Sequence, residues 1–505
     1  MNQPAYNDFI SGFNEIKSLS MNVFPAGRFK EQFLQSVYLF EEYVKRFNKK
    51  MILADLFAGI GTYSIFFSTY YRQISRKIYS TEKDAESYKL LKHMIEKYGC
   101  SDIVTPCKVD KRAGFNPYIT RELKQIKFDS IIANPPYVPT PPGKRYCGWA
   151  NGGALGISAI IELLKGLDNY AWPESIFGFL SYSIGCSNPE KGSLIIGTLR
   201  QKLNSELNAE YNRYLDLLSK VNEKWRLKVF VLNPPAWVGY KKDASKETIA
   251  LKDYYKLIFP RSDEKIKKYV GVFKLRNRYI SNLFVMGTPR DNADKIKRVI
   301  IKNIGTRYID KVMEIEQACW PYYLQASRSN LYSRLRYFSA GCVGAFDING
   351  KMLGFATSQV VDFTPYADVR IRRIENWMKL DNFSDADIRT TSDKRGNALH
   401  LVSGCVLPEY TNNGIWKDMI IYRLRLAKFL GLEYVVILSR LKKTGPDRDI
   451  SNIMNYIEKS IDPNLRCLEK FGFKVNSLIP KPLDTESGGY WVIMYKKLEG
   501  KYEHE

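Results

Sequence analysis

The order of apolar and polar stretches divides the chain into two parts with different patterns. In the first part, short apolar runs alternate with amphipathic or polar helical stretches, starting with an apolar run at 51–58 that leads into a glycine turn. A strand, a turn and a helix repeated in this order predict a parallel sheet with crossover helices. The predicted strands are 51–58, 77–82, 102–110, 128–137, 175–184, 225–237 and 277–287, and the predicted helices are 84–99, 156–170 and 194–225.

The pattern changes after about residue 295. Residues 310–338 have helical spacing, and 340–363 alternate between apolar and polar positions around Asn349-Gly350, which predicts a β-hairpin. Strands at 399–407, 434–438 and 490–498 and an amphipathic helix at 415–431 complete an α+β pattern with mostly antiparallel strands. We therefore expect one domain at 1–295, a linker at 296–307 and a second domain at 308–505.

Composition is that of an ordinary globular protein. The chain has 505 residues, of which 45% are hydrophobic and 26% are charged. Its beginning lacks the pattern of a secretory signal, and no apolar run approaches the roughly 18 residues that would span a bilayer. The eight cysteines lie far apart without a C-x-x-C pair, which disfavours a zinc site or a disulfide framework. We therefore expect no metal, no membrane partner and a reducing, cytoplasmic location.

Positive charge is concentrated in the first part. Residues 1–300 carry 47 Lys and Arg against 29 Asp and Glu, a net charge of +18 out of +24 for the whole chain. Such an excess attracts polyanions, so nucleic acid is one candidate partner of this part. The basic residues are scattered, however, and a solvated Lys-rich surface explains the same charge equally well.

The first candidate site follows the first predicted strand. Asp55, Phe57, Ala58, Gly59 and Gly61 belong to the run DLFAGIG, which connects this strand to a helix. Glycines in this place let the backbone approach a ligand closely, and the helix N-terminus adds a positive pole. Glu82 ends the second strand, where a carboxylate can accept hydrogen bonds from a ribose diol, or can simply be solvated.

The tetrapeptide Asn134-Pro135-Pro136-Tyr137 ends the fourth predicted strand. With DLFAGIG before it, the sequence over roughly 20–290 resembles class I methyltransferases that use S-adenosylmethionine (SAM), in the N-P-P-Y branch that methylates planar nitrogens. The resemblance implies a Rossmann-like, doubly wound sheet of seven strands and a SAM site that includes Asp110 beside the adenine. Residues 152–156 are similar to the G-G-x-[DS]-G segment of release-factor glutamine methyltransferases, from which Leu155 departs. A second triplet at 233–236 lacks the aromatic residue, and we interpret it as a strand terminator.

The tetrapeptide suits chemistry on a delocalised amino group. Such a nitrogen is a poor nucleophile because its lone pair is conjugated. The Asn134 side-chain oxygen and the Pro135 carbonyl can each accept one N–H, which turns the lone pair toward the methyl sulfonium. Pro136 stiffens the turn, and Tyr137 offers a face to the planar substrate and the cation. Catalysis would then be alignment for in-line displacement without a covalent intermediate.

The second part, from about 308 to 500, resembles the GNAT superfamily of CoA-dependent acyltransferases. The resemblance rests on the stretch VSGCVLPEYTNNGIWKDMIIYRLRLAKFLGLEYVVIL. It implies an acetyl-CoA or other acyl-CoA site in which a loop and a helix N-terminus hold the pyrophosphate, with Leu407, Gly414, Ile415 and Trp416 as contacts. The usual loop has a basic or amide residue where Thr411 stands, and a small residue where Trp416 stands.

Two further residues follow from a closer likeness to GNAT domains of polyketide loading modules. Members of that type use a threonine on the early hairpin and a histidine near the fourth strand, which places Thr357 and His400 as catalytic candidates. The histidine could also be a hydrogen-bonded strand residue, and Glu409 is an alternative base. The family's acid-donating tyrosine is replaced by Leu468.

The expected function is therefore a SAM-dependent N-methyltransferase fused to a CoA-dependent acyltransferase. The methyl acceptor is open between an amino group on a specialised metabolite or carrier, adenine in nucleic acid, and a protein glutamine amide. The alternative is a nucleic-acid or protein methyltransferase whose GNAT part binds a partner without catalysis.

Overall fold

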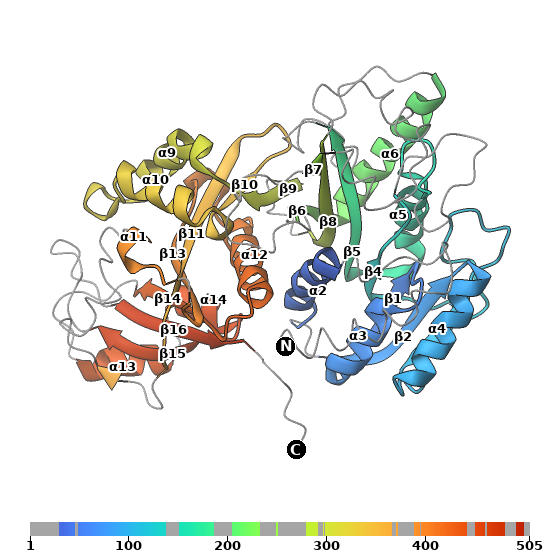
Figure 1. Cartoon of the computed structure of the whole chain (residues 1–505), viewed down its shortest axis with the longest axis horizontal. Coiled ribbons are helices and arrows are strands. Elements are labelled where there is room, and N and C mark those ends of the chain that lie inside the picture. The colour runs from blue at the N-terminus through green and yellow to red at the C-terminus, as the bar shows by residue number, and fades with distance from the viewer. Residues whose placement is uncertain are drawn as a thin grey trace.

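The computed structural model describes residues 30–45, 49–137, 151–185, 205–232, 249–250, 279–290, 296, 298–365, 370–371, 388–393, 395–441, 450–459, 462–479 and 491–498. The second Asn-Pro-Pro triplet lies outside these residues. Two lobes lie side by side, an N-terminal part up to residue 290 and a C-terminal part from residue 309 (Figure 1). The strands of both belong to one mixed sheet, in the order β12-β15-β16-β14-β13-β11-β10-β9-β6-β8-β5-β4-β1-β2-β3, with β7 paired to β8.

The N-terminal part is an α/β layer structure. Its strands β1 to β5 run parallel to one another, whereas β8 is antiparallel to both of its neighbours, β5 and β6. Its strands are β1 (Met51–Leu56), β2 (Ser75–Glu82), β3 (Val104–Lys108), β4 (Phe128–Ala133), β5 (Ala171–Gly185), β6 (Trp225–Val231), β7 (Ile249–Ala250) and β8 (Tyr279–Pro289). Its helices are α2 (Lys30–Val44), α3 (Thr62–Tyr70), α4 (Ala85–Lys97), α5 (Ser158–Tyr170) and α6 (Ser205–Lys224).

The C-terminal part is mostly antiparallel, as the alternating pattern predicts, with β13–β14 and β12–β15 as parallel pairs. Its strands are β10 (Val343–Phe346), β11 (Met352–Val361), β12 (Arg370–Ile371), β13 (Ala398–Val406), β14 (Tyr434–Arg440), β15 (Lys474–Ile479) and β16 (Trp491–Lys497). Its helices are α9 (Ile309–Cys319), α10 (Arg328–Tyr337), α11 (Ile388–Thr391), α12 (Ile415–Phe429), α13 (Ile450–Glu458) and α14 (Pro463–Glu469). Leu468 belongs to α14, and its side chain is buried in the core.

The segment 296–307, expected as a linker, contains a strand. Strand β9 (Arg298–Asn303) pairs in parallel with β6 and antiparallel with β10, so it joins the two parts of the sheet. Its centre, Val299–Ile301, is buried and β-branched, the residue type that suits a strand paired on both sides. The chain therefore passes from one part to the other inside the sheet.

Helix α2 lies between the two parts, beside α12 (Figure 1). The inward side chains of α2 pack on the N-terminal part, as Phe40 does with Phe67 of α3 and Phe284 of β8. Helix α12 has buried residues on all its faces, which an ordinary surface helix does not. Both helices are therefore interior elements of one structure.

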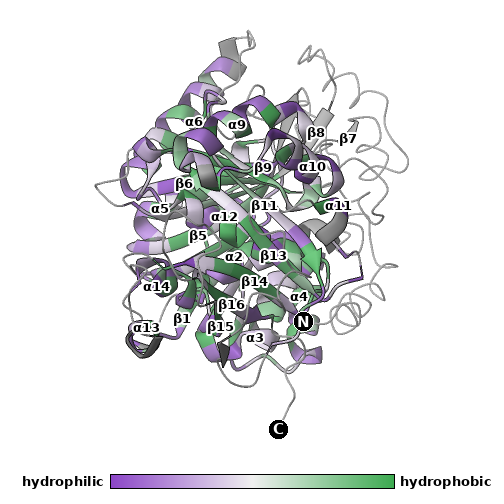
Figure 2. Ribbon diagram, turned by 90° about the vertical axis from the view of Figure 1, so that its left-hand side faces the viewer, coloured by the Kyte–Doolittle hydropathy of each residue, from purple (hydrophilic) through white to green (hydrophobic). Residues whose placement is uncertain are grey.

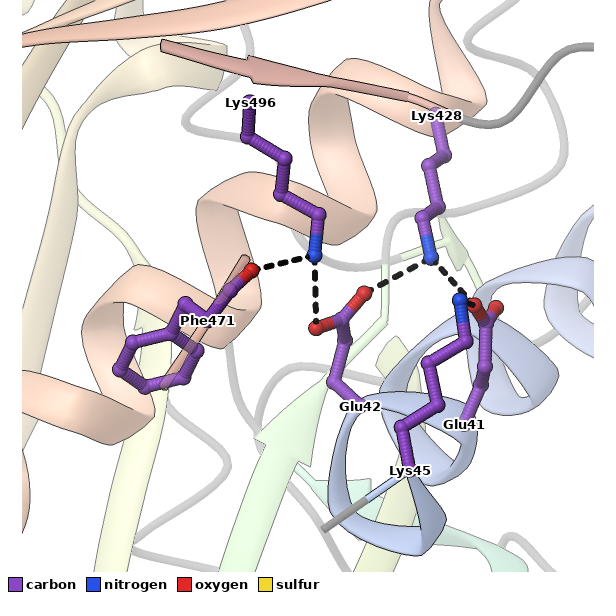
Figure 3. A network of polar contacts seen from close by, with 6 residues as sticks. All are labelled: Glu41, Glu42, Lys45, Lys428, Phe471 and Lys496. Atoms are coloured by element: carbon purple, nitrogen blue, oxygen red, sulfur yellow. Dashed lines mark hydrogen bonds and ion pairs between the residues drawn. The ribbon is translucent and has the colours of Figure 1, made fainter. Parts of the chain in front are cut away.

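A network of buried charges connects these helices (Figure 3). The Lys428 ammonium on α12 lies 2.8 Å from carboxylate oxygens of both Glu41 and Glu42 on α2. Lys45 pairs with Glu41, and Lys496 on β16 lies 3.5 Å from Glu42. Burial alone would raise the pKa of Glu42, but Lys428, then Lys496 and Lys45, outweigh it and lower the pKa to about 2. The two carboxylates are thus ionised, and the three ammonium groups of Lys45, Lys428 and Lys496 compensate them.

Hydrophobic residues gather along the strands, while hydrophilic residues mark outward turns of helices such as α6 and α9 (Figure 2). One buried cluster contains side chains from both parts, including Phe40 on α2, Phe230 on β6 and Tyr422 on α12. The rings of Phe230 and Tyr422 stack with centroids 6.2 Å apart, and the Tyr422 hydroxyl donates to the Val231 carbonyl at 2.6 Å. The core is therefore continuous across the junction.

Lys428→Met tests the junction. It leaves two buried carboxylates with less compensation, and we expect the free energy of unfolding to fall by about 3 kcal/mol. Urea unfolding of the full chain gives this value, with one cooperative transition expected because the core is shared. The control Lys165→Met removes an exposed partner of Glu162 on α5 and should cost at most about 1 kcal/mol. Equal effects of the two substitutions would contradict the role of the network.

Candidate functional site

The carboxyl ends of β1, β2 and β4 meet at one edge of the N-terminal part. Strand β1 lies between the other two, with Asp55 opposite Ser80 of β2 and Leu56 opposite Ala133 of β4. From β1 the chain continues to β2 and β3 on one side, and then crosses to β4 and β5 on the other side of β1. Open α/β sheets bind ligands at such a topological switch point. The glycine turn follows β1 and the tetrapeptide 134–137 follows β4, so the two predicted motifs come together here.

The turn after β1 has an unusual backbone. Phe57, Gly59 and Gly61 all have positive φ, at 60°, 58° and 86°. A Cβ on Gly61 would stand 2.5 Å from the Leu91 side chain, so this glycine allows α3 and α4 to pack closely. A Cβ on Gly59 would have no atom within 4 Å among the described residues, so the backbone here borders open space. The turn is anchored by Ala58 N–H, which donates to the Thr81 carbonyl at 2.8 Å.

Two carboxyl groups flank this turn. Asp55 is buried, and its Oδ2 accepts from Ser64 N at 3.0 Å and Ser64 Oγ at 2.6 Å, while Oδ1 has no hydrogen-bond partner in the described part of the chain. Glu82 accepts from Gly59 N at 2.8 Å and Asp84 N at 2.6 Å. Burial raises the pKa of each carboxyl to about 7, despite these hydrogen bonds. Each Glu82 oxygen keeps a second lone pair for a ligand hydroxyl.

Asp110 lies beside this edge but is exposed. It follows β3, and the adjacent Val109 N–H donates to the Glu82 carbonyl at 3.0 Å, which places the loop next to the end of β2. Its Oδ1 accepts from Arg112 N at 2.7 Å. The residue is thus near the site, on the side of β2 and β3.

The tetrapeptide is supported by the glycine segment that follows it. A Cβ on Gly152 would stand 2.7 Å from Tyr137 Cα and 2.8 Å from the Pro136 carbonyl oxygen, so only glycine fits there. Pro135 is buried, whereas Asn134 is partly exposed. Leu155, where the resembling segment has a polar residue, is buried in the core. The segment 152–156 therefore packs directly on the tetrapeptide, and the Asn134 amide stays at the edge of the sheet.

The second candidate site lies where β13 and β14 part. Their parallel pairing runs from Ala398–Tyr434 to Leu401–Ile437 and stops, although both strands continue. Beyond this point β14 still pairs with β16, and β13 still pairs with β11. The facing edges of β13 and β14 therefore carry backbone groups that can bond to an extended ligand.

Thr357 and His400 lie on the same face of β11 and β13. The Thr357 hydroxyl hydrogen-bonds to Ser403 Oγ at 2.8 Å, and His400 Nδ1 lies 3.1 Å from Gln359 Nε2. Burial, then the charges of Arg334 and Arg423, lower the pKa of His400 to about 3. The imidazole is therefore neutral at pH 7 and is a weak base there. Glu409 is exposed beside Lys351.

The loop after β13 leads to the N-terminus of α12. Leu407 N–H donates to the Leu353 carbonyl at 2.9 Å, so it extends the sheet pairing, and the Ile415 side chain is buried in the core. Gly414 is the N-cap of α12 with φ 68°, and the Trp416 indole lies 3.3 Å from the position of a Cβ on Gly404. The missing side chain of Gly404 thus makes room for the indole, and the amides of Ile415, Trp416 and Lys417 at the start of α12 have no acceptor within the helix.

Residues from the N-terminal part reach this helix end, which the sequence did not predict. Arg226 Nη1 lies 3.4 Å from the position of a Cβ on Gly414. Asp418, in the first turn of α12, accepts from Lys228 at 2.8 Å and from the Tyr43 hydroxyl at 2.6 Å, and Arg226 lies 3.7 Å from it. Nothing in the spacing of these residues along the sequence signals that they meet.

No group of His, Cys, Asp and Glu suited to a metal ion occurs among the described residues. None of the described helices combines the length and apolar character that crossing a bilayer requires.

Comparison with known proteins gives likenesses that cover only part of the chain. No protein-family model matches the chain. The probable hydrolase YhcX of Bacillus subtilis (strain 168) is 25% identical over 205 residues, which is 39% of this chain and 38% of YhcX. The chain thus spans little more than a third of that relative.

Solved structures similar to the chain include GNAT domains and methyltransferases. The loading GNATL domain of CurA from Lyngbya majuscula is 20% identical with a TM-score of 0.32, over 39% of this chain and 97% of that domain. Precorrin-6y C5,15-methyltransferase from Geobacter metallireducens GS-15 is 11% identical with a TM-score of 0.25, over 51% of this chain and 88% of that enzyme.

Proposed function

We propose that the chain transfers a methyl group from SAM to a planar amino or amide nitrogen in its N-terminal part and an acyl group from CoA in its C-terminal part. The observation that carries the proposal is the meeting of the glycine turn and the Asn134–Tyr137 tetrapeptide at the switch point between β1 and β4. The strand order β3-β2-β1-β4-β5-β8-β6, with β8 antiparallel, supports a seven-stranded Rossmann-like methyltransferase sheet.

The residues at the switch point fit SAM. The Asp55 Oδ1 atom is buried without a hydrogen bond among the described residues, and the backbone at Gly59 borders open space. Glu82 would accept from the ribose hydroxyls, and two carboxyl groups favour a cationic ligand. When bound, SAM supplies an electrophilic methyl group on a sulfonium.

The tetrapeptide would orient the acceptor. Asn134 Oδ1 and the Pro135 carbonyl each accept one hydrogen of the substrate NH2, so the nitrogen lone pair faces the methyl group. Gly152 packs against the second half of the tetrapeptide, at Pro136 and Tyr137. No strong general base is required because the proton leaves after transfer.

In the C-terminal part, the first turn of α12 would hold the CoA pyrophosphate through its free amides. Gly414–Trp416 fit this role. Thr411 stands where the usual loop has a basic or amide residue, and Arg226 and Lys228, which also pair with Asp418, would add positive charge nearby. The Leu407 N–H already donates to Leu353, so it is not available to CoA. Leu407 would therefore contribute to this site only through its position in the sheet. Thr357 and a neutral His400 would hydrogen-bond the acyl group, with Glu409 as the alternative base.

The methyl acceptor is tested with the full chain and methyl-labelled SAM in a host lysate. After the reaction, the lysate is separated into a small-molecule and carrier fraction, a nucleic-acid fraction and a protein fraction. The fraction that keeps the label identifies the acceptor class. Label in a small-molecule or carrier fraction supports the metabolite; label in DNA or RNA supports adenine, and label in protein supports a glutamine amide. Absence of label from all fractions contradicts the methyltransferase assignment.

Asn134→Ala should reduce methyl transfer to the labelled fraction by about 100-fold or more, because the amino group is no longer aligned. SAM affinity, measured by calorimetry, should change less than about threefold, since the turn after β1 is intact. Asn169→Ala, on the exposed face of α5, is the matched control and should retain full activity. Undiminished transfer by Asn134→Ala would refute the assignment of the tetrapeptide.

SAM binding should strengthen as the pH rises through 7. The raised pKa values leave Asp55 and Glu82 largely protonated below about pH 7 and ionised above it, and the ionised forms accept the ribose hydroxyls and attract the cation. Between pH 6 and pH 8 the affinity should rise up to about tenfold. Glu82→Gln should flatten this dependence; an unchanged slope in that variant would exclude Glu82 as the titrating group.

Gly414→Ala should weaken acetyl-CoA binding by about tenfold, because the side chain strains the left-handed N-cap beside Arg226. Gly431→Ala is the matched control, with φ 71° just beyond the other end of α12 and open space around its Cβ position. Calorimetry of both variants separates backbone strain from loss of the site. Equal affinities in the two variants would place the CoA site elsewhere.

A further inference from the structure

Two cysteines that lie far apart in the sequence meet beside the second site. Cys319 ends α9, and Cys405 lies near the end of β13. Each thiol contacts the residue next to the other cysteine: Cys319 Sγ donates to the Val406 carbonyl at 3.3 Å, and Trp320 Nε1 donates to Cys405 Sγ at 2.8 Å. These two contacts bring the C-terminus of α9 and the end of β13 together, with both thiols at the place where they meet.

The surroundings of the two thiols differ. Cys319 is half-buried, whereas Cys405 is buried. Cys405 Sγ donates to Glu316 Oε2 at 3.5 Å, and the other oxygen of Glu316 accepts from Ala326 N at 2.9 Å. The neighbouring Cys405 thiol lowers the pKa of Cys319, and the same interaction together with burial raises the pKa of Cys405. Cys319 is thus the accessible nucleophile, and Cys405 is a protonated thiol next to a carboxylate.

Other cysteines in the described part of the chain offer a contrast. Cys342 is fully buried, and its burial raises the pKa of its thiol to about 12. Its Sγ donates to the Arg334 carbonyl at 3.4 Å. A thiol in this environment is inert, which makes Cys342 a matched internal control.

We propose that Cys319 and Cys405 form a reactive dithiol that exchanges with low-molecular-weight disulfides such as glutathione disulfide. Cys319 first loses its proton to water. The resulting thiolate attacks one sulfur of the disulfide, forms a mixed disulfide and releases one glutathione thiolate, which is protonated by water. Cys405 then passes its proton to Glu316 and attacks Cys319 Sγ. The Cys319–Cys405 bond forms, the second glutathione leaves and takes the proton, and the small disulfide has been reduced by the two electrons that the protein thiols lost.

The bond would tie the C-terminus of α9 to the end of β13, two residues before Leu407. It closes a long loop of chain, so the oxidised protein should melt at a higher temperature than the reduced protein.

The test uses the reduced full chain, incubated with glutathione disulfide under anaerobic conditions. After alkylation of the remaining thiols, peptide mapping should find Cys319 linked to Cys405, and dithiothreitol should reverse the link. Cys405→Ser should stop at a stable glutathione adduct on Cys319, Cys319→Ser should form neither product, and Cys342→Ser should behave as the parent protein. Glu316→Gln should slow the second step by about tenfold or more, so that the adduct accumulates.

The result that overturns the proposal is a parent protein in which no Cys319–Cys405 peptide forms, or in which reaction ends at the glutathione adduct. Alkylation of Cys342 at the rate of Cys319 would equally contradict it. Because the mapping of the parent protein decides the question, a serine variant that fails to fold does not affect the outcome.

Discussion

The ion pairs between Lys428 and the carboxylates of Glu41 and Glu42 hold together the two elements on which both sites depend. Glu41 and Glu42 belong to α2, which packs on strands of the N-terminal part, and Lys428 belongs to α12, whose first turn begins at Gly414. Charges this deeply buried are tolerated only when they are paired and hydrogen-bonded. The position of α12, and with it the loop at its N-terminus, is therefore fixed against the N-terminal part.

The shared sheet also fixes the position of the C-terminal part against the N-terminal part. Strand β9 exchanges backbone hydrogen bonds with β6 on one side and β10 on the other, so the two parts have a common hydrogen-bond ladder. Arg226 and Lys228 on β6 reach Asp418 on α12 directly above this ladder of strands. A fusion of two domains through a free linker would not share a sheet, whereas here the strands of both parts form one sheet and two buried clusters contain side chains from both parts.

The two candidate sites have opposite electrostatic character. At the switch point, Asp55 and Glu82 are carboxyl groups whose burial favours the protonated form until a cation or hydroxyl donors arrive. At the N-terminus of α12, backbone amides favour an anion, and the Asp418 carboxylate in the same turn is compensated by Lys228 and Arg226. These polarities agree with a sulfonium ligand in the first site and a pyrophosphate in the second, as the proposed function requires.

Local sequence patterns predicted most elements because each pattern acts over a few residues. The runs that became β1, β2, β4 and β13, the hairpin around Asn349-Gly350 and helix α12 were found within a few residues of their observed bounds. Strand β9 was missed because a short β-branched run between polar residues does not reveal that two strands will pair with it. Helix α2 itself was not predicted, and its contact with α12 joins residues such as Glu41 and Lys428, which lie 387 positions apart, so no local pattern signals it.

The sequence by itself determined which motifs exist and the strand ends on which they lie, because turn glycines and prolines act through local backbone geometry. Tertiary structure alone decided which of them meet: the turn after β1 with the tetrapeptide after β4, Cys319 with Cys405, and the arginine of one part with the helix end of the other. It also decided that His400 is a neutral, buried residue, because its pKa depends on burial and on arginines from two other helices.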